Sequence, residues 1–129
     1  MPNAIALKVL VVDDQTSVRK MTRMNLEEIG IRHIHEAENG QQGLETASLQ
    51  PIDLIISDYN MPVMDGLDFL RAVRGHPTVR KVPFILLTGR SDKELVVKAA
   101  QAGVNNYLIK PFTAAILRQK IEQVIGKLS

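Results

Sequence analysis

The chain has 129 residues, of which 45% are hydrophobic, and its 16 Lys and Arg residues nearly balance 14 Asp and Glu residues to give a net charge of +2. This length predicts a single domain, residues 1–129, with a substantial buried core. So small a net charge, together with only 4% aromatic residues, argues against a nucleic-acid partner. No apolar run is long enough to span a membrane. Because cysteine is absent, disulfides, thiolate metal sites and Cys nucleophiles are excluded, and we expect a cytoplasmic protein.

Short apolar runs alternate with amphipathic stretches along the chain. The runs predict five strands, at 7–12, 31–37, 54–57, 82–87 and 106–109. Helices are expected between and after them, over about 16–29, 40–49, 67–73, 92–102 and 114–127. This alternation predicts an α/β protein in which a five-stranded parallel sheet carries helices on both faces. The most suitable architecture is the doubly wound, flavodoxin-like (βα)5 fold, from which we take the strand order 2-1-3-4-5.

The first helix has an expected cap and an expected inward face. Thr16 or Ser17 has a side chain suited to cap it, and Gly30 is expected to end it. Its inward face is expected to consist of apolar residues at helical spacing, namely Val18, Met21, Leu26 and Ile29.

The last two helices carry more aliphatic residues than one buried face needs. In the helix over 92–102, which Ser91 and Glu94 are spaced to cap, we expect the side chains of Val97 and Ala100 to face the core. Val96, together with Leu95, would then be exposed. In the last helix, capped by Thr113, an inward stripe of Leu117, Ile121 and Val124 would leave Ile116 facing outward beside Lys120.

Polar side chains stand at the carboxyl ends of four of the five strands. Asp13 and Asp14 follow the first strand, Asp58 the third, Thr88 the fourth and Lys110 the fifth. Taken alone, Asp58 is as readily explained as a turn former or helix cap. In a doubly wound sheet, however, all five side chains would share the crevice where such folds bind ligands. Sharing one crevice makes a purely structural role hard to defend.

Three carboxylates in one crevice need compensation. Two carboxylates about 5 Å apart repel by about 3 kcal/mol at an effective dielectric of 20, so a set of three requires protonation or a divalent cation. A site made only of oxygen ligands suits Mg²⁺. An Asp carboxylate can accept a phosphoryl group covalently, and a lysine and a metal ion would neutralise the charge on the transferred group. Thr88 could donate a hydrogen bond to a phosphoryl oxygen, and Gly89, which has no side chain, would let the backbone N–H come close to it.

The motifs DD, DYNMPVMDG, TG and KPF follow successive strands in this order, and together they closely resemble the receiver domain of two-component response regulators. The resemblance covers nearly the whole chain, and the chain ends soon after the fifth helix, as in single-domain, chemotaxis-type regulators. It implies that Asp58 accepts a phosphoryl group from the phosphohistidine of a histidine kinase. It also implies that Asp13, Asp14, Asp58 and the backbone carbonyl of Asn60 bind Mg²⁺.

The resemblance implies further roles in switching. Thr88 would be the switch hydroxyl, Lys110 the phosphate-binding lysine, and Tyr107 an aromatic side chain that swings inward on activation. From the residues alone, Tyr107 is better explained as a packing residue on a short edge strand. The Lys110–Pro111 peptide bond is expected to be cis, and Arg90 occupies a position that tunes the lifetime of the phosphoryl group.

The same resemblance implies a set of partners. A face formed by the last two helices and the strand between them would bind a downstream target, for which the flagellar motor switch is a candidate, through Val96, Tyr107, Ile116 and Lys120. A histidine kinase and a phosphatase would be the other partners, and we expect the protein to be a monomer.

Three alternatives stay open. The domain could be a phosphorelay intermediate or a cell-cycle or developmental regulator, which the sequence does not separate from a chemotaxis protein. It could be an aspartyl-phosphate phosphohydrolase, although Asn60 stands where haloacid-dehalogenase enzymes place a second Asp, so we expect no enzyme. A flavodoxin-type FMN carrier would need a Ser/Thr/Gly-rich phosphate loop where this chain has Asp13, Asp14 and Gln15.

Overall fold

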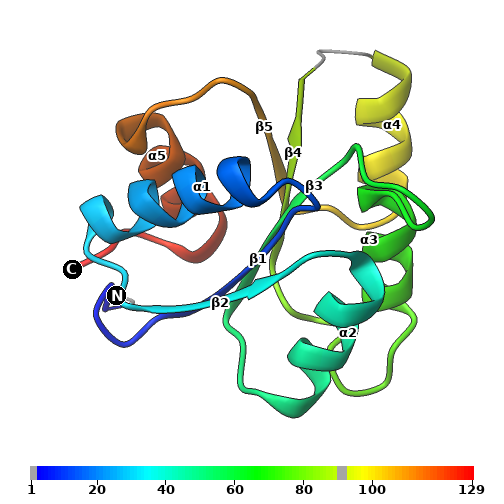
Figure 1. The fold of residues 1–129 in the computed structure, drawn as a ribbon, viewed down its shortest axis with the longest axis horizontal. Coiled ribbons are helices and arrows are strands. Elements are labelled where there is room, and N and C mark those ends of the chain that lie inside the picture. Colours follow the sequence, from blue (N-terminus) through cyan, green and yellow to red (C-terminus); the bar gives the residue numbers. More distant parts are fainter. Residues whose placement is uncertain (1–2, 90–92) are drawn as a thin grey trace.

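Five parallel strands form one sheet in the order β2-β1-β3-β4-β5 (Figure 1). The computed structural model describes residues 3–89 and 93–129. The strands are β1 (Lys8–Val12), β2 (His33–Ala37), β3 (Leu54–Asp58), β4 (Phe84–Thr88) and β5 (Asn106–Ile109). The doubly wound, flavodoxin-like fold and its strand order are therefore confirmed. Strand β4 starts two residues later than expected, because Pro83 has no N–H to contribute to the ladder.

Helices cover both faces of the sheet. They are α1 (Thr16–Ile29), α2 (Gly40–Leu49), α3 (Gly66–Arg74), α4 (Lys93–Gln101) and α5 (Ala114–Ile125). Helices α1 and α5 lie on one face, and α2, α3 and α4 lie on the other (Figure 1). Within the described residues, none of these helices has the length and apolar character to cross a membrane.

The two faces of the sheet hold two separate apolar cores. Along β1, Leu10 and Val12 pack toward α2, α3 and α4, whereas Val9 and Val11 pack toward α1 and α5. All four side chains are at most 1% exposed. Burial on both faces explains why the three central strands, β1, β3 and β4, are nearly continuous apolar runs instead of alternating apolar and polar residues.

Helix α1 differs from the expectation in its cap and in its inward face. Its N-cap is Gln15, which makes no side-chain capping hydrogen bond, so the prediction of Thr16 or Ser17 was wrong. The buried positions are Arg19, Thr22 and Leu26, whereas Met21 is 63% exposed. The inward stripe therefore includes a charged residue, Arg19.

Helix α4 is rotated relative to the expectation. Leu95 and Ala99, one turn apart, are buried, while Val97 is 53% exposed, Ala100 is exposed and Val96 is half-buried. The expectation that Val97 and Ala100 face the core was wrong. Burying the larger leucine removes more apolar area from water than burying a valine. The capping residue Ser91 lies outside the described residues.

Helix α5 matches the expectation. Leu117 and Ile121 are fully buried, Val124 is half-buried, and Ile116 is 42% exposed. Thr113 caps the helix by accepting a hydrogen bond from the Ile116 N–H at 3.2 Å.

Candidate functional site

The corner between β3 and α3 places Asp58 at the edge of the sheet. Asp58 is the last residue of β3 and is 4% exposed. The next residue is held on both sides, because the Tyr59 N–H donates to the Leu87 carbonyl at 2.7 Å and the Gly66 N–H donates to the Tyr59 carbonyl at 2.8 Å. A Cβ at Gly66 would collide with the Asp58 carbonyl oxygen and lie 2.7 Å from Leu86 Cδ1. Only glycine fits so close to the strand that carries Asp58.

The end of β1 presents the acidic pair. The Asp13 N–H donates to the Ala37 carbonyl at 3.1 Å, which extends the pairing of β1 with β2 by one residue. Asp13 is 1% exposed, whereas Asp14 is exposed. One oxygen of Asp13, Oδ1, accepts the Gln15 N–H at 2.9 Å. The other, Oδ2, is buried and has no hydrogen-bond partner in the described part of the chain. A buried carboxylate oxygen without a partner is costly unless something else occupies the site.

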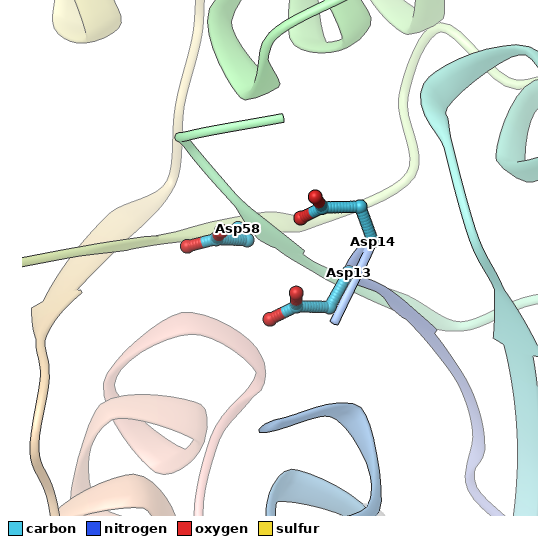
Figure 2. Close-up of side chains that lie close together, drawn as sticks. All are labelled: Asp13, Asp14 and Asp58. Atoms are coloured by element: carbon cyan, nitrogen blue, oxygen red, sulfur yellow. The ribbon is translucent and has the colours of Figure 1, made fainter. Parts of the chain in front are cut away.

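The carboxylates of Asp13, Asp14 and Asp58 gather at the carboxyl ends of β1 and β3 (Figure 2). One oxygen from each lies within 4.8 Å of the others. The pKa of Asp13 is raised to about 6, mainly by burial and also by the charges of Asp58 and Asp14, against the Gln15 N–H and Lys110, which lower it. The site thus holds more negative charge than its single lysine compensates, and its ligand atoms are close enough for one cation.

Lys110 brings the positive charge. Its Nζ donates to Asp58 Oδ1 at 2.7 Å, and its side chain is 27% exposed. Its backbone N–H donates to the Thr88 carbonyl at 2.8 Å, which ties the ends of β4 and β5 together. The Lys110–Pro111 peptide bond is cis, as predicted. Thr88 itself ends β4 and is 3% exposed.

A cleft of about 250 Å³ opens over these residues; it is lined by Gln15, Asp58, Tyr59, Asn60, Thr88, Gly89 and Lys110. The strand-end residues expected to converge therefore do lie together. Gln15 and Tyr59 also line the cleft, although the sequence analysis gave them no role. Their positions directly after Asp14 and Asp58 were the only available signal.

The expected partner face lies at the β5 edge of the sheet. Tyr107 is half-buried and packs against the core on the α4 side, and Lys120 Nζ lies 5.5 Å from the centroid of its ring. Exposed aliphatic side chains occur on the strand of Tyr107 and on the helices before and after it, namely Ile109 on β5, Val97 on α4 and Ile116 on α5. Val96 is only half-buried and so contributes less than expected. Arg90 lies outside the described residues.

A family model described as the response regulator receiver domain matches residues 9–122. The chain belongs to this family. Over 128 residues, this receiver is 46% identical to a "Probable chemotaxis protein CheY" from Rhizobium etli, with 99% of each chain covered.

Solved structures agree with this assignment. The receiver superposes on chemotaxis protein CheY4 of Vibrio cholerae with a TM-score of 0.86 at 35% identity, covering 92% of this chain and 98% of that one. It superposes on the receiver domain of a sensor histidine kinase from Pseudomonas aeruginosa with a TM-score of 0.83 at 31% identity, covering 94% and 98% of the two chains. That structure has a magnesium ion coordinated in its active site cleft. The protein is thus a CheY-like receiver, a class whose members signal.

Proposed function

We propose that this receiver accepts a phosphoryl group on Asp58 from a phosphohistidine of a histidine kinase, with Mg²⁺ bound at the acidic cluster. The observation that carries the proposal is the pairing of Asp58 with Lys110 at 2.7 Å beside two further carboxylates. A carboxylate oxygen of Asp58 attacks phosphorus, an O–P bond forms, and the N–P bond to the donor imidazole breaks. The imidazole leaves with the electron pair of the broken bond and takes up a proton.

The residues present fit Mg²⁺. The ligands would be Asp13, Asp14, Asp58 and the backbone carbonyl of Asn60, all hard oxygen donors. Among the described residues, the buried Oδ2 of Asp13 has no hydrogen-bond partner, so this oxygen is available as a cation ligand. When bound, the ion neutralises negative charge on the phosphoryl oxygens. The protein's own contribution is to hold the Asp58 carboxylate at the end of β3 and the Lys110 ammonium beside it, so that little reorganisation is needed during transfer.

The signal would leave the site through β4 and β5. A phosphoryl group on Asp58 attracts the Thr88 hydroxyl, and the space vacated admits the half-buried ring of Tyr107. To move a two-state equilibrium from 1:99 to 99:1 takes about 5.5 kcal/mol, which charge-assisted hydrogen bonds from Lys110 and Thr88 and a bound cation can together supply. Movement of Tyr107 would rearrange its contact with Lys120 and the exposed face beside Ile116. That face would bind the downstream target, with Arg90 modulating how long the phosphoryl group lasts.

We assign the pathway to chemotaxis because the relatives that match nearly end to end are CheY proteins. On this proposal the protein is a monomeric cytoplasmic signalling domain, and its target is a protein such as the flagellar motor switch. A phosphorelay intermediate is the second candidate, because a sensor-kinase receiver superposes almost as well. Incubating the phosphorylated protein with a histidine phosphotransfer domain distinguishes the two, since only a relay intermediate passes the group on rapidly.

Intact-mass spectrometry after incubation with acetyl phosphate and Mg²⁺ tests the chemistry directly. We expect one phosphoryl adduct on the wild type and none on Asp58→Asn or without Mg²⁺. Asp68→Asn is the matched control, because this carboxylate is exposed on α3 and pairs only loosely with Arg71 at 3.8 Å. An adduct that survives in Asp58→Asn would refute the assignment of the acceptor. Rapid release of phosphate without an adduct would point to an enzyme instead.

A further inference from the structure

A buried arginine on α1 contacts the acidic pair from behind. Arg19 is 8% exposed and lies on the inward face of α1. Its Nη1 donates to the backbone carbonyl of Asp13 at 2.6 Å, the only side-chain donor recorded on that oxygen among the described residues. A charge-assisted bond this short is stronger than an ordinary backbone hydrogen bond.

Arg19 is itself held in place by a carboxylate on the neighbouring strand. Its Nε donates to Glu36 Oε1 at 2.9 Å, and Glu36 Oε2 accepts Arg23 Nη1 at 2.9 Å. Burial alone would raise the pKa of Glu36, but the hydrogen bonds from Arg19 and Arg23 outweigh it and lower the pKa. Glu36 therefore remains ionised and fixes the plane of the Arg19 guanidinium.

The two backbone polar groups of Asp13, which belong to successive peptide groups, are consequently both held. Its N–H is bonded to β2 through the Ala37 carbonyl at 3.1 Å, and its carbonyl is bonded to α1 through Arg19. This carbonyl belongs to the peptide bond that joins Asp13 to Asp14. The orientation of that peptide sets the direction in which both carboxylates leave the strand. Two like charges so close repel each other, so a backbone free to rotate would let them separate.

We infer that Arg19 is a positioning residue for the divalent cation: by holding the Asp13–Asp14 peptide, with Glu36 and Arg23 behind it, Arg19 keeps the two carboxylates converged on one ion. This inference rests on the proposed function of the same site. Loss of a group that orients metal ligands typically weakens metal binding 10- to 100-fold. Because Arg19 acts through the backbone and not on a carboxylate oxygen, we expect its loss to weaken metal binding about 10-fold, at the lower end of this range. The chemistry at Asp58 and Lys110 should be unchanged once the metal site is full.

The experiment measures metal binding and phosphorylation separately. Arg19→Met keeps the length and apolar stem of the side chain but removes every donor, and Arg19→Lys keeps the charge with a single donor group. Binding of Mn²⁺ to the unphosphorylated protein is followed by the electron paramagnetic resonance of the free ion. Phosphorylation by acetyl phosphate is followed by mass across a Mg²⁺ titration, which yields a half-saturating Mg²⁺ concentration and a maximal rate. Arg118→Met, at an exposed α5 residue 3.7 Å from Glu122, is the matched control.

For Arg19→Met we expect Mn²⁺ affinity to fall about 10-fold and the half-saturating Mg²⁺ concentration to rise by the same factor, with the maximal rate unchanged. Arg19→Lys should recover part of the loss, and Arg118→Met should match the wild type. If Arg19→Met does not fold, Glu36→Gln replaces it, since it leaves the arginine in place but weakens its support, and a smaller loss in the same direction is expected. Unchanged metal affinity, or a fall in maximal rate alone, would overturn the inference. If the wild type itself binds no Mn²⁺ and gains no adduct, it is the proposed function that fails.

Discussion

Replacing Asp13 by asparagine should stabilise the metal-free protein while abolishing its capacity for a divalent cation. The carboxylate of Asp13 is 1% exposed, and one of its oxygens has no hydrogen-bond partner among the described residues. An asparagine keeps an oxygen for the Gln15 N–H but carries no charge beside Asp58 and Asp14. The substitution therefore removes a desolvated charge without creating a cavity.

The magnitude follows from the pKa. Asp13 has a pKa of about 6 in the folded protein and 3.8 as its ordinary value. At 1.36 kcal/mol per pKa unit, ionising Asp13 in the fold costs up to about 3 kcal/mol of stability at neutral pH. The sign is that of a raised pKa: between pH 3.8 and 6 the folded state binds more protons than the unfolded state. The stability of the wild type therefore falls across that window as the pH rises, and the cost is complete above it.

Urea denaturation followed by far-UV circular dichroism measures this cost. In EDTA at pH 7.5 we expect Asp13→Asn to be more stable than the wild type by about 2 to 3 kcal/mol. Below the ordinary pKa, where both proteins are neutral at this position, the difference should vanish. Addition of Mg²⁺ at about 100 times its dissociation constant should stabilise only the wild type, by about 2.7 kcal/mol, and so nearly close the gap.

Any of three results would contradict this reasoning. A mutant that is equally stable or less stable at pH 7.5 in EDTA would mean that burial beside Asp58 and Asp14 does not destabilise the ionised carboxylate of Asp13. A difference that persists at low pH would mean that asparagine stabilises by packing or hydrogen bonding and not by removal of charge. Equal stabilisation of both proteins by Mg²⁺ would place the cation elsewhere.

Three further substitutions test local structure, two of them beside the site and the third at the opposite edge of the sheet. Val63 is fully exposed and has a φ of 69°, which a β-branched residue rarely adopts without strain. Val63→Asn should therefore raise the free energy of unfolding by about 1 kcal/mol. An unchanged free energy of unfolding in a urea titration would show that the backbone at Val63 is not strained. Gly66→Ala should lower the free energy of unfolding by about 3 kcal/mol and reduce phosphorylation of Asp58, because the added Cβ would collide with the Asp58 carbonyl oxygen. Full adduct formation would show that the backbone between β3 and α3 can adjust to the added Cβ. Arg74, at the end of α3, donates hydrogen bonds to four oxygen acceptors, and burial lowers the pKa of its guanidinium. Arg74→Met should therefore lower the free energy of unfolding by about 3 kcal/mol, measured by thermal or urea unfolding. The exposed control Arg118→Met should lower it by less than about 0.5 kcal/mol.

The strands and the site edge could be predicted from the sequence because their signal is local. Each central strand is a nearly continuous apolar run; Asp58 and Thr88 are the last residues of β3 and β4, and Lys110 directly follows β5. In a parallel sheet every such residue reaches the same edge, so adjacency in sequence translates directly into proximity in space. The strand order itself came from knowledge of the fold, since no pairing signal in the residues distinguishes β1–β3 from other neighbours.

The orientation of the helices was less predictable. Helix α4 has three consecutive aliphatic residues, and an apolar count does not determine which of them turns inward. The structure buries Leu95 with Ala99, and consequently exposes Val97 instead of Val96. The expected partner face therefore keeps its place at the β5 edge but changes one of its apolar contacts. Such a choice depends on how large side chains fit the core, which is a property of the assembled fold.

The burial of Arg19 was not predicted, although the spacing of residues in α1 contains a signal for it. Positions 19, 22 and 26 are spaced as one face of a helix, and they are the buried face of α1. Assigning the inward stripe to the apolar residues Val18 and Met21 moved that face by one residue and placed the arginine outside it. An arginine almost never faces a core without a partner, so its presence in the stripe predicts a buried acceptor nearby. The acceptors are the Glu36 carboxylate on β2 and the backbone carbonyl of Asp13 at the end of β1. Arg19 reaches both because α1 packs back against the sheet beside that end of β1.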